Sequence, residues 1–300
     1  MKRKAKGQKI RRSFSERLFD TLNTVFMVVL IVITLYPFLY VLFASLSNSA
    51  QLMRHSGVLL KPLGFTTNAY RTIFKNVMVP LGFRNSLIIL VAGTILNLTV
   101  TSLGAYALSR KGPMFTGIVM KMCVFTMFFS GGMIPSYLLI RNLNLLDTFA
   151  SLILPGTVST TNLIIMRTAF LSIPDSLPES AEIDGANDLV ILMRIVLPLS
   201  MATLAVILLY YGVGHWNSWF SASIYLRTRT KFPIQLVLRE VLITDSTENF
   251  LVMADGMEKD AEGDVLKYAM IIVATVPVLC IYPFLQRFFT KGVMIGAIKS

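Results

Sequence analysis

Charged residues and cysteines are both scarce in this 300-residue sequence. Charged side chains make up 15% of it, whereas soluble domains contain about 25%. Hydrophobic residues make up 54%, and there are two cysteines. A soluble globule of this composition could not cover its surface with polar side chains, so the sequence predicts a membrane protein.

Several sequence features of enzymes and ion-driven carriers are absent. The two cysteines, Cys123 and Cys280, lie inside apolar runs and are expected to pack rather than to form a disulfide or hold a metal. No Gly-x-x-x-x-Gly-Lys-Ser/Thr loop is present, which argues against ATP binding by this chain. The sequence also lacks a Ser-His-Asp set and acidic residues at mid-membrane depth. We therefore predict no catalytic residue, no metal and no bound cofactor.

The net charge of +12 is concentrated beside the apolar runs rather than in an aromatic-basic motif. Eight of the first 17 residues are Lys or Arg, and Glu16 is the one acid among them. Such flanks contact anionic lipid and stay in the cytoplasm. The expected partner of this charge is the lipid bilayer and not nucleic acid. A cleaved signal peptide is disfavoured because the first apolar run is too long.

Six apolar runs reach the length of about 20 residues that a helix needs to cross the hydrocarbon core. They are Leu22–Leu46, Ser86–Leu108, Val119–Ile140, Thr148–Phe170, Leu199–Phe220 and Val265–Leu285. The predicted fold class is an all-α membrane protein with six transmembrane helices and both termini in the cytoplasm. We expect a basic cytoplasmic segment 1–20, a transmembrane domain 21–290 and a cytoplasmic tail 291–300.

Two long segments between these runs are predicted to lie outside the cell. Asn48–Arg84 carries five Lys/Arg and no acid, which suits either acidic oligosaccharides or the docking of a binding protein. Arg227–Asp264 carries eight of the sixteen acids. Its charge is compatible with a docking face or with a solvated cap, and its spacing does not match an EF-hand.

The segment 173–198 is polar and lies between the fourth and fifth apolar runs, which places it in the cytoplasm. We expect a short helix with Ser176 as its N-cap and Gly185 closing it in a left-handed conformation. A second helical segment, Asp188–Val196, is expected to lead back to the membrane. A helix fixed between two spans can pass a push from a soluble partner to the membrane helices. The alternative is that Glu179 only caps its helix.

The order of residues in this segment resembles the "EAA" loop of permease subunits in bacterial ATP-binding-cassette (ABC) importers. That pattern is Glu-Ala-Ala, three residues, Gly, nine residues and Ile-x-Leu-Pro, and Ser180 stands at its second position. Asp184-Gly185-Ala186 is similar to the form found in the carbohydrate-uptake branch. The resemblance implies that the following residues couple the chain to an ATPase: Glu179, Ala181, Asp184, Gly185, Ala186, Ile195, Leu197 and Pro198.

Other motifs extend the resemblance across most of the chain. Trp216-Asn217-x-Trp219-Phe220 is similar to a signature of sugar permeases. Gln286–Gly292 resembles the C-terminal end of the maltose-type second permease. Phe129–Pro135 resembles a subgroup tied to complex polysaccharide fragments and named for lipoprotein-linked permeases.

The resemblance implies the type I ABC importer permease fold, with the cytoplasmic segment as its coupling helix, in the bacterial cell membrane. It also implies a second homologous permease, two ATPase subunits that bind ATP and Mg, and an extracellular solute-binding protein. The implied substrate is an oligosaccharide, and the basic outer segment suits acidic, pectin-type ones. A permease of the same machinery for a non-sugar solute and a membrane protein without a transport role, such as a membrane enzyme, are the alternatives.

Sugar sites combine aromatic faces with hydrogen-bonding side chains. The predicted spans offer such residues for a substrate path: Asn97, Thr101, Asn162, Tyr210, Tyr211, Trp216 and Asn217. The alternative is hydrogen bonding between helices, which Ser, Thr and Asn commonly provide in membranes. Trp216 also fits an anchor at the membrane interface.

Overall fold

The computed structural model describes residues 13–110, 112, 114–243 and 263–297, and every regular element in this part of the chain is helical. The long helices are α1 (Phe14–Ser45), α4 (Met78–Ser109), α12 (Met201–Trp216) and α16 (Gly263–Ala297). The shorter ones are α2 (Ser49–Met53), α3 (Asn68–Lys75), α5 (Thr116–Phe128), α6 (Met133–Asn142), α7 (Ala150–Ile153), α8 (Thr160–Leu171), α9 (Ser176–Ile183), α10 (Asp188–Ile191), α11 (Leu197–Leu199), α13 (Trp219–Tyr225) and α14 (Ile234–Ile243). Residues 244–262 of the predicted acidic outer segment, most of the basic N-terminus and the last three residues lie outside the described residues.

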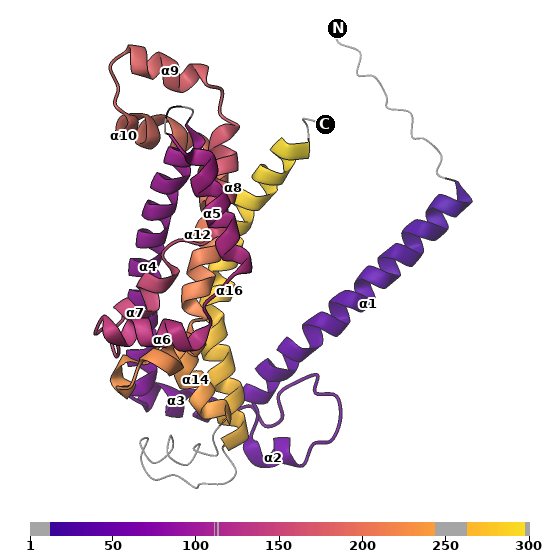
Figure 1. The fold of residues 1–300 in the computed structure, drawn as a ribbon. Helices are drawn as coiled ribbons and strands as arrows, with labels where there is room; N and C mark the ends of the chain where they lie inside the picture. The colour runs from indigo at the N-terminus through magenta and orange to yellow at the C-terminus, as the bar shows by residue number, and fades with distance from the viewer. Residues whose placement is uncertain (1–12, 111, 113, 244–262, 298–300) are drawn as a thin grey trace.

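The helices α4, α8, α12 and α16 form an upright bundle (Figure 1). At one end of the molecule lie α9, the first residues of α1 and the last residues of α16; we call this the α9 end. At the opposite end lie α2, α3 and α14; we call this the α14 end. The segment predicted to be cytoplasmic therefore shares one end of the molecule with the beginning of the first span and the end of the last.

Three of the predicted spans are continuous helices. By length and apolar composition, α1, α4 and residues Gly263–Ile281 of α16 can each cross a membrane, and two bent helix pairs raise the number to as many as five. Leu22–Leu46, Ser86–Leu108 and Val265–Leu285 coincide with these three helices. The total of six spans remains a prediction.

The third predicted span, Val119–Ile140, is not a straight helix. It is formed by α5 and α6, which are bent by 114° at a short break. Phe129 is extended at this break, and Gly132 has a φ of 83°. Two successive glycines, Gly131 and Gly132, allow the chain to turn where a side chain would be strained. The motif that carries the sequence resemblance here is thus also the cause of the bend.

The fourth predicted span, Thr148–Phe170, is also not one continuous helix. It comprises α7, a 3-10 turn at Leu154–Gly156 and α8, with an extended Ser159 before α8 (φ −91°, ψ 123°). Pro155 lacks a backbone N–H and disrupts the helical hydrogen-bond ladder. The fifth run, Leu199–Phe220, contains α12 and begins at an 88° bend.

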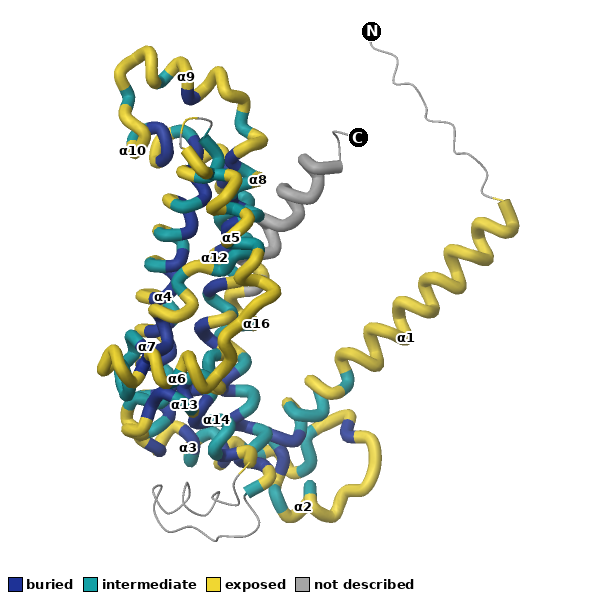
Figure 2. Tube along the Cα trace, viewed as in Figure 1, coloured by how far each residue is buried: buried dark blue, intermediate teal, exposed yellow. Residues whose placement is uncertain are grey.

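The bundle and α1 differ sharply in burial (Figure 2). Of the most apolar 18-residue window of α1, 0% is buried, whereas the corresponding window of α4 is 33% buried. The hydroxyls of Thr21, Thr24 and Thr34 donate to carbonyls one turn earlier, so they do not leave polar atoms unpaired on this surface. Contact with the bundle occurs near the end of α1, where the rings of Tyr40 and Tyr268 are 5.9 Å apart. An apolar helix surface is left for lipid or for another protein.

Candidate functional site

The helix α9 begins one residue earlier than predicted. The N-cap is Asp175 and Ser176 is already helical, because the N–H of Glu179 donates to the carbonyl of Asp175 over 3.1 Å. Pro178 occupies the third helical position, where its missing N–H leaves no bond unmade. Glu179 is exposed in the first turn, where a carboxylate is favoured by the helix dipole.

The end of α9 explains why Ala181, Gly185 and Ala186 occur at this spacing. Gly185 has a φ of 83°, which confirms the predicted left-handed conformation. Its N–H donates to the carbonyl of Glu182 over 3.0 Å, and the N–H of Ala186 donates to the carbonyl of Ala181 over 2.9 Å. This pair of bonds is the Schellman motif, which closes a helix and reverses the chain. Ala181 and Ala186 both pack against one hydrophobic cluster of the bundle.

The return to the membrane passes through a π-helical turn, Leu192–Val196, between α10 and α11. Asn187 caps α10 by accepting a hydrogen bond from the N–H of Val190 over 2.9 Å. Pro198 follows the π turn and has no N–H for an α-helical bond, so the ladder changes register just before it. The predicted helical segment Asp188–Val196 is therefore helical throughout, although not as a single α-helix. Ile195 and Leu197 are partly buried against the bundle.

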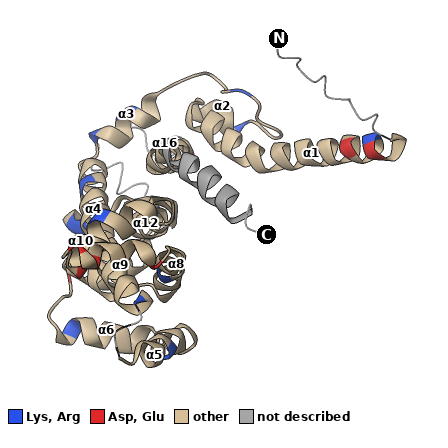
Figure 3. Ribbon diagram, turned by 90° about the horizontal axis from the view of Figure 1, so that it is seen from above, with Lys and Arg blue, Asp and Glu red and all other residues tan. Residues whose placement is uncertain are grey.

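A cavity of about 590 Å³ lies between α9, α10 and the end of α4. Among the described residues, its acidic lining residues are Asp175, Glu179, Glu182 and Asp188, and its basic one is Arg110. Seen from this end, the ribbon in Figure 3 is coloured for acidic residues beside α9 and α10. The surplus of carboxylates gives this hollow a negative potential that suits a basic partner surface.

A polar network crosses the middle of the bundle. The amide nitrogen of Asn97 donates to the carbonyls of Gly156 and Thr157 over 2.6 and 2.9 Å. Its oxygen therefore faces His215, whose Nε2 donates to it over 2.7 Å. The side chains of Asn97 and His215 are both buried. The network satisfies carbonyls that the broken helix around Pro155 leaves without helical partners.

A second pair of side chains holds the same broken segment. The hydroxyls of Thr101 and Tyr211 are 2.8 Å apart, and the Tyr211 hydroxyl accepts a hydrogen bond from the N–H of Ser159 over 2.9 Å. Asn97, Thr101 and Tyr211 are thus brought together by the structure, although their polar atoms bond to protein groups. His215, which lies in the same predicted span as Tyr211, contacts this group through its hydrogen bond to Asn97.

The other predicted path residues lie elsewhere. Trp216 is buried; its indole N–H donates to the carbonyl of Ala274 over 3.3 Å, and the ring lines an apolar cavity of about 300 Å³. Asn162 is buried in α8, whereas Tyr210 and Asn217 are exposed. Within the described residues, no group of three or more His, Cys, Asp and Glu side chains is arranged to hold a metal ion.

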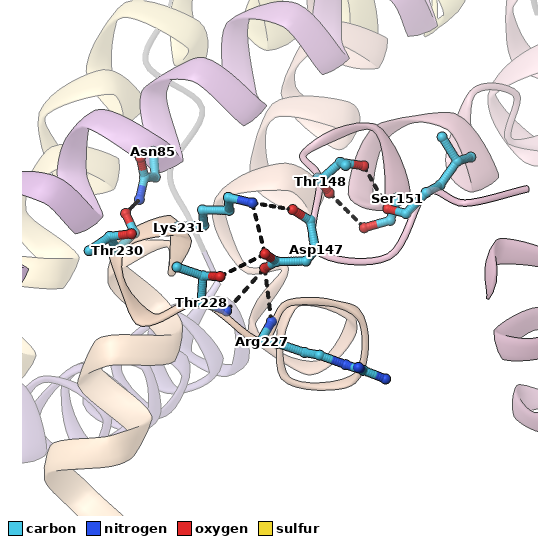
Figure 4. Close-up of polar contacts among 9 residues, drawn as sticks. Asn85, Asp147, Thr148, Ser151, Arg227, Thr228, Thr230 and Lys231 are labelled. Atoms are coloured by element: carbon cyan, nitrogen blue, oxygen red, sulfur yellow. Dashed lines mark hydrogen bonds and ion pairs between the residues drawn. The ribbon is translucent and has the colours of Figure 1, made fainter.

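The α14 end contains a cluster that the sequence did not reveal, which we call the Asp147 clasp: Asp147, Arg227, Thr228 and Lys231 (Figure 4). The Asp147 carboxylate accepts hydrogen bonds from the N–H groups of Arg227 and Thr228, both over 3.0 Å. It also accepts from the Thr228 hydroxyl over 2.7 Å and from Nζ of Lys231 over 2.8 Å. These donors hold the pKa of the carboxyl well below its usual range, with Lys231 contributing most.

Comparison with known proteins shows to which family the chain belongs. No protein-family model matches the sequence. The chain is 40% identical over 284 residues to the polygalacturonan/rhamnogalacturonan transport system permease protein YtcP of Bacillus subtilis (strain 168), which covers 95% of this chain and 99% of the relative. It is 27% identical over 273 residues to the arabinooligosaccharides transport system permease protein AraQ of Halalkalibacterium halodurans, covering 89% of this chain and 92% of that one.

The fold matches a solved structure as well. The neighbour is described as the crystal structure of a bacterial ABC transporter involved in the import of the acidic polysaccharide alginate. The match has a TM-score of 0.85 and 29% sequence identity, and it covers 94% of this chain and 100% of the other. Fold and relatives together define a multi-pass membrane permease, a transport component rather than an enzyme. The chain belongs to the family of carbohydrate permease subunits of ABC importers.

Proposed function

We propose that this chain is one of two different permeases in an ATP-driven importer of acidic, pectin-type oligosaccharides. The observation that carries the proposal is the 40% identity, over 95% of the chain, to a permease named for polygalacturonan and rhamnogalacturonan transport. The fold match to an importer of alginate, an acidic polysaccharide, supports the same class of substrate.

Charge at the α14 end supports an acidic substrate. All five basic residues of the segment Asn48–Arg84 are exposed, and the segment contains no acid. A surface of one sign raises the local concentration of oppositely charged ligands. Uronate carboxylates would be attracted to it, and so would an acidic face of a solute-binding protein. We place this end outside the cell.

The two unpartnered surfaces support the proposed assembly. The exposed apolar length of α1 is suited to a second, homologous permease, which would cover it within the bilayer. The exposed α9 and the acidic cavity behind it suit a basic groove on one of the two ATPase subunits, which would bind ATP and Mg. We place the α9 end and both termini in the cytoplasm of a bacterial cell, with α9 as the coupling helix and six spans in all.

The proposed mechanism uses α9 as a rigid lever. ATP-driven closure of the ATPases would push Glu179 and the rest of α9, which the Schellman motif holds as a compact unit. The push would reach the bundle through α8 and through the π turn before α12. Asn97, Thr101 and Tyr211 would shape the path by holding the broken segment around Pro155. The exposed Tyr210 and Asn217 are the better candidates for direct contact with sugar.

The test is reconstitution of the importer in proteoliposomes with its second permease, ATPase and binding protein. We expect oligogalacturonides to be taken up and to stimulate ATP hydrolysis, with neutral maltooligosaccharides as the control. Uptake of neutral sugars alone would overturn the acidic-substrate assignment. Stimulation only by a non-sugar solute would favour a permease of the same machinery for that solute. No solute-dependent hydrolysis at all would favour a membrane protein without a transport role. Recovery of this chain only as a homodimer that is active in uptake would overturn the pairing with a different permease.

A further inference from the structure

The end of α4 contacts residues 173–198, which we call the coupling segment, through a buried tyrosine. Tyr106 is 7% exposed, and its hydroxyl donates to Oδ1 of Asp188 over 3.0 Å. Asp188 is the first residue of α10, the helix that follows α9. The guanidinium carbon of Arg110 lies 4.4 Å from the centre of the Tyr106 ring and covers it from the side of the cavity. The hydroxyl is therefore positioned toward α10 by packing on its ring.

The chain itself does not connect α9 to α4. The coupling segment is continuous with α8 on one side and, through α10 and α11, with α12 on the other. Arg167 of α8 also bonds to α4, since it donates to the carbonyl of Leu108 over 2.8 Å. This bond belongs to the route through α8, which precedes α9 in the chain, and not to the route through α10, which follows it. A movement of α9 that passes along α10 reaches α4 through side-chain contacts. The Tyr106–Asp188 hydrogen bond is a direct polar link between α4 and α10.

The helix α4 makes hydrogen bonds to other segments near both of its ends and in its middle. A movement of one end of α4 can therefore reach the rest of the bundle. The helix has 32 residues and is roughly 48 Å long at a rise of 1.5 Å per residue. Its middle holds the broken segment through Asn97 and Thr101. At the α14 end, Asn85 donates to the carbonyls of Thr230 and Phe232, and Ser86 accepts from the N–H of Ile234.

We propose that Tyr106 is a positioning residue that transmits movement of the coupling segment to α4 through its hydrogen bond to Asp188. This inference rests on the proposed function as an ATP-driven permease. It adds a route through α4 to the routes through α8 and α12. Without the Tyr106 hydroxyl, α9 still moves with the ATPases. The movement of α4, and of the broken segment around Pro155 that α4 holds, becomes smaller. ATP is then hydrolysed with less transport.

The first experiment compares Tyr106→Phe with wild type in the reconstituted importer. Phenylalanine keeps the ring, which packs with Ile191 and Leu192 in one cluster, and removes only the hydroxyl. We expect unchanged assembly and basal ATP hydrolysis, and a loss of about fivefold in substrate transported per ATP, at the lower end of typical coupling between linked sites. Transport per ATP equal to wild type in an assembled complex overturns the proposal.

Variants at Asp188 separate the hydrogen bond from other effects. Asp188→Ala removes the same bond together with one acid of the cavity, so it should lose at least as much coupling as Tyr106→Phe. The double variant should lose no more than Asp188→Ala alone, because both changes remove one bond. Asp188→Asn keeps an oxygen that can accept from the hydroxyl and should retain coupling. The control is Thr99→Val, since that hydroxyl donates within α4, to Ile95, over 2.8 Å. Additive losses in the double variant overturn the proposal.

A second measurement does not depend on the substrate. Hydrogen exchange of the amides of residues 187–196 is compared between the full wild-type chain and Tyr106→Phe. Loss of the link should raise exchange in α10 and leave α14 unchanged. Equal exchange in both chains overturns the link whether or not a sugar is transported. If no carbohydrate stimulates the wild-type complex but exchange rises as expected, the proposed function fails and the link between α4 and α10 stands.

Discussion

The two ends of α4 are attached to their neighbours in different ways. At the α14 end, Asn85 and Ser86 bond to backbone groups of the segment that leads into α14, and this segment is bonded in turn to Asp147. At the α9 end, Tyr106 reaches an acid, Asp188, that is itself exposed. The first attachment uses backbone groups and a carboxylate with several donors, whereas the second depends on side chains beside an open cavity.

This difference indicates which end of the molecule is built to move. Segments with exposed hydrogen bonds and little apolar burial open at low free energy, whereas densely bonded segments open only with the whole fold. Most of α9 is exposed, including Ile183 at 87%. The Asp147 clasp joins the α6–α7 connection to the segment before α14 across about 80 residues of sequence. We expect the α14 end to behave as one rigid unit and the α9 end to respond to its partner.

Replacing Asp147 should have the largest effect on stability. In Asp147→Ala, two backbone N–H groups and Lys231 lose their acceptor, and alanine must adopt the φ of 57° found at this position. Loss of a charged hydrogen bond and the left-handed conformation together cost about 3 kcal/mol. Thermal unfolding of the purified chain in detergent should shift down by several degrees. An unchanged melting temperature would mean that the clasp does not stabilise the α14 end.

The matched control is Asp147→Asn, since asparagine tolerates the same backbone conformation and keeps one acceptor oxygen. Its loss should be smaller and should depend on pH. Because the pKa of Asp147 is lowered in the folded state, its contribution is fully present above about pH 5 and declines as the pH falls further. The difference in melting temperature between wild type and Asp147→Asn should therefore shrink below that pH. A constant difference down to acid pH would contradict this account.

The middle of α4 can be tested by adding a single methyl group. A Cβ at Gly93 would clash with the ring of His215, which is held in place by Asn97. Gly93→Ala should cost about 1 to 3 kcal/mol as an overpacked core. In the same helix, a Cβ at Gly104 would have its nearest neighbour at 3.4 Å. Gly104→Ala should be neutral or slightly stabilising because alanine favours a helix. Equal melting temperatures for the two variants would contradict the described packing around His215.

Sequence reasoning succeeded where the signal was local. The long apolar runs identified α1, α4 and α16, and the spacing of Gly185 predicted a left-handed helix end. It failed where a run of suitable composition is interrupted. Gly132 and Pro155 were present in the apolar runs, but hydropathy averages over them and does not report a bend of 114°.

The candidate site was predictable only in part for a related reason. Polar residues inside spans were recognised as unusual, but their partners come from distant parts of the chain. Asn97 bonds to carbonyls some 60 residues away, and Asp147 to groups about 80 residues away. No local pattern encodes such pairs. The sequence could therefore propose Asn97 and Thr101 for a path without revealing that their polar atoms bond to the broken segment around Pro155.

Gly185→Ala should have a small effect on stability. Apart from its chain neighbours, no described residue has an atom within 4 Å of a Cβ at this position, so its cost comes from the φ of 83°. That cost is about 1 kcal/mol for an L-residue. Gly185→Asn should cost less, since asparagine tolerates this conformation. Hydrogen exchange of the amides of Gly185 and Ala186 should rise in the alanine variant as the Schellman motif weakens. A melting loss as large as that of Asp147→Ala would show that α9 is packed more tightly than its exposure indicates.

Glu179→Ala should leave stability almost unchanged, because the residue is exposed and such substitutions usually stay within about 0.5 kcal/mol. If Glu179 couples the permease to its ATPase, substrate-stimulated ATP hydrolysis should nevertheless fall, while membrane insertion and melting temperature stay as in wild type. Glu182→Ala is the control, an exposed acid on the same helix that lies outside the matched motif. A loss shared equally by both variants would indicate a general effect of negative charge around the cavity. Wild-type stimulation by Glu179→Ala would remove the coupling role, because the remaining function of a first-turn acid is to stabilise its own helix.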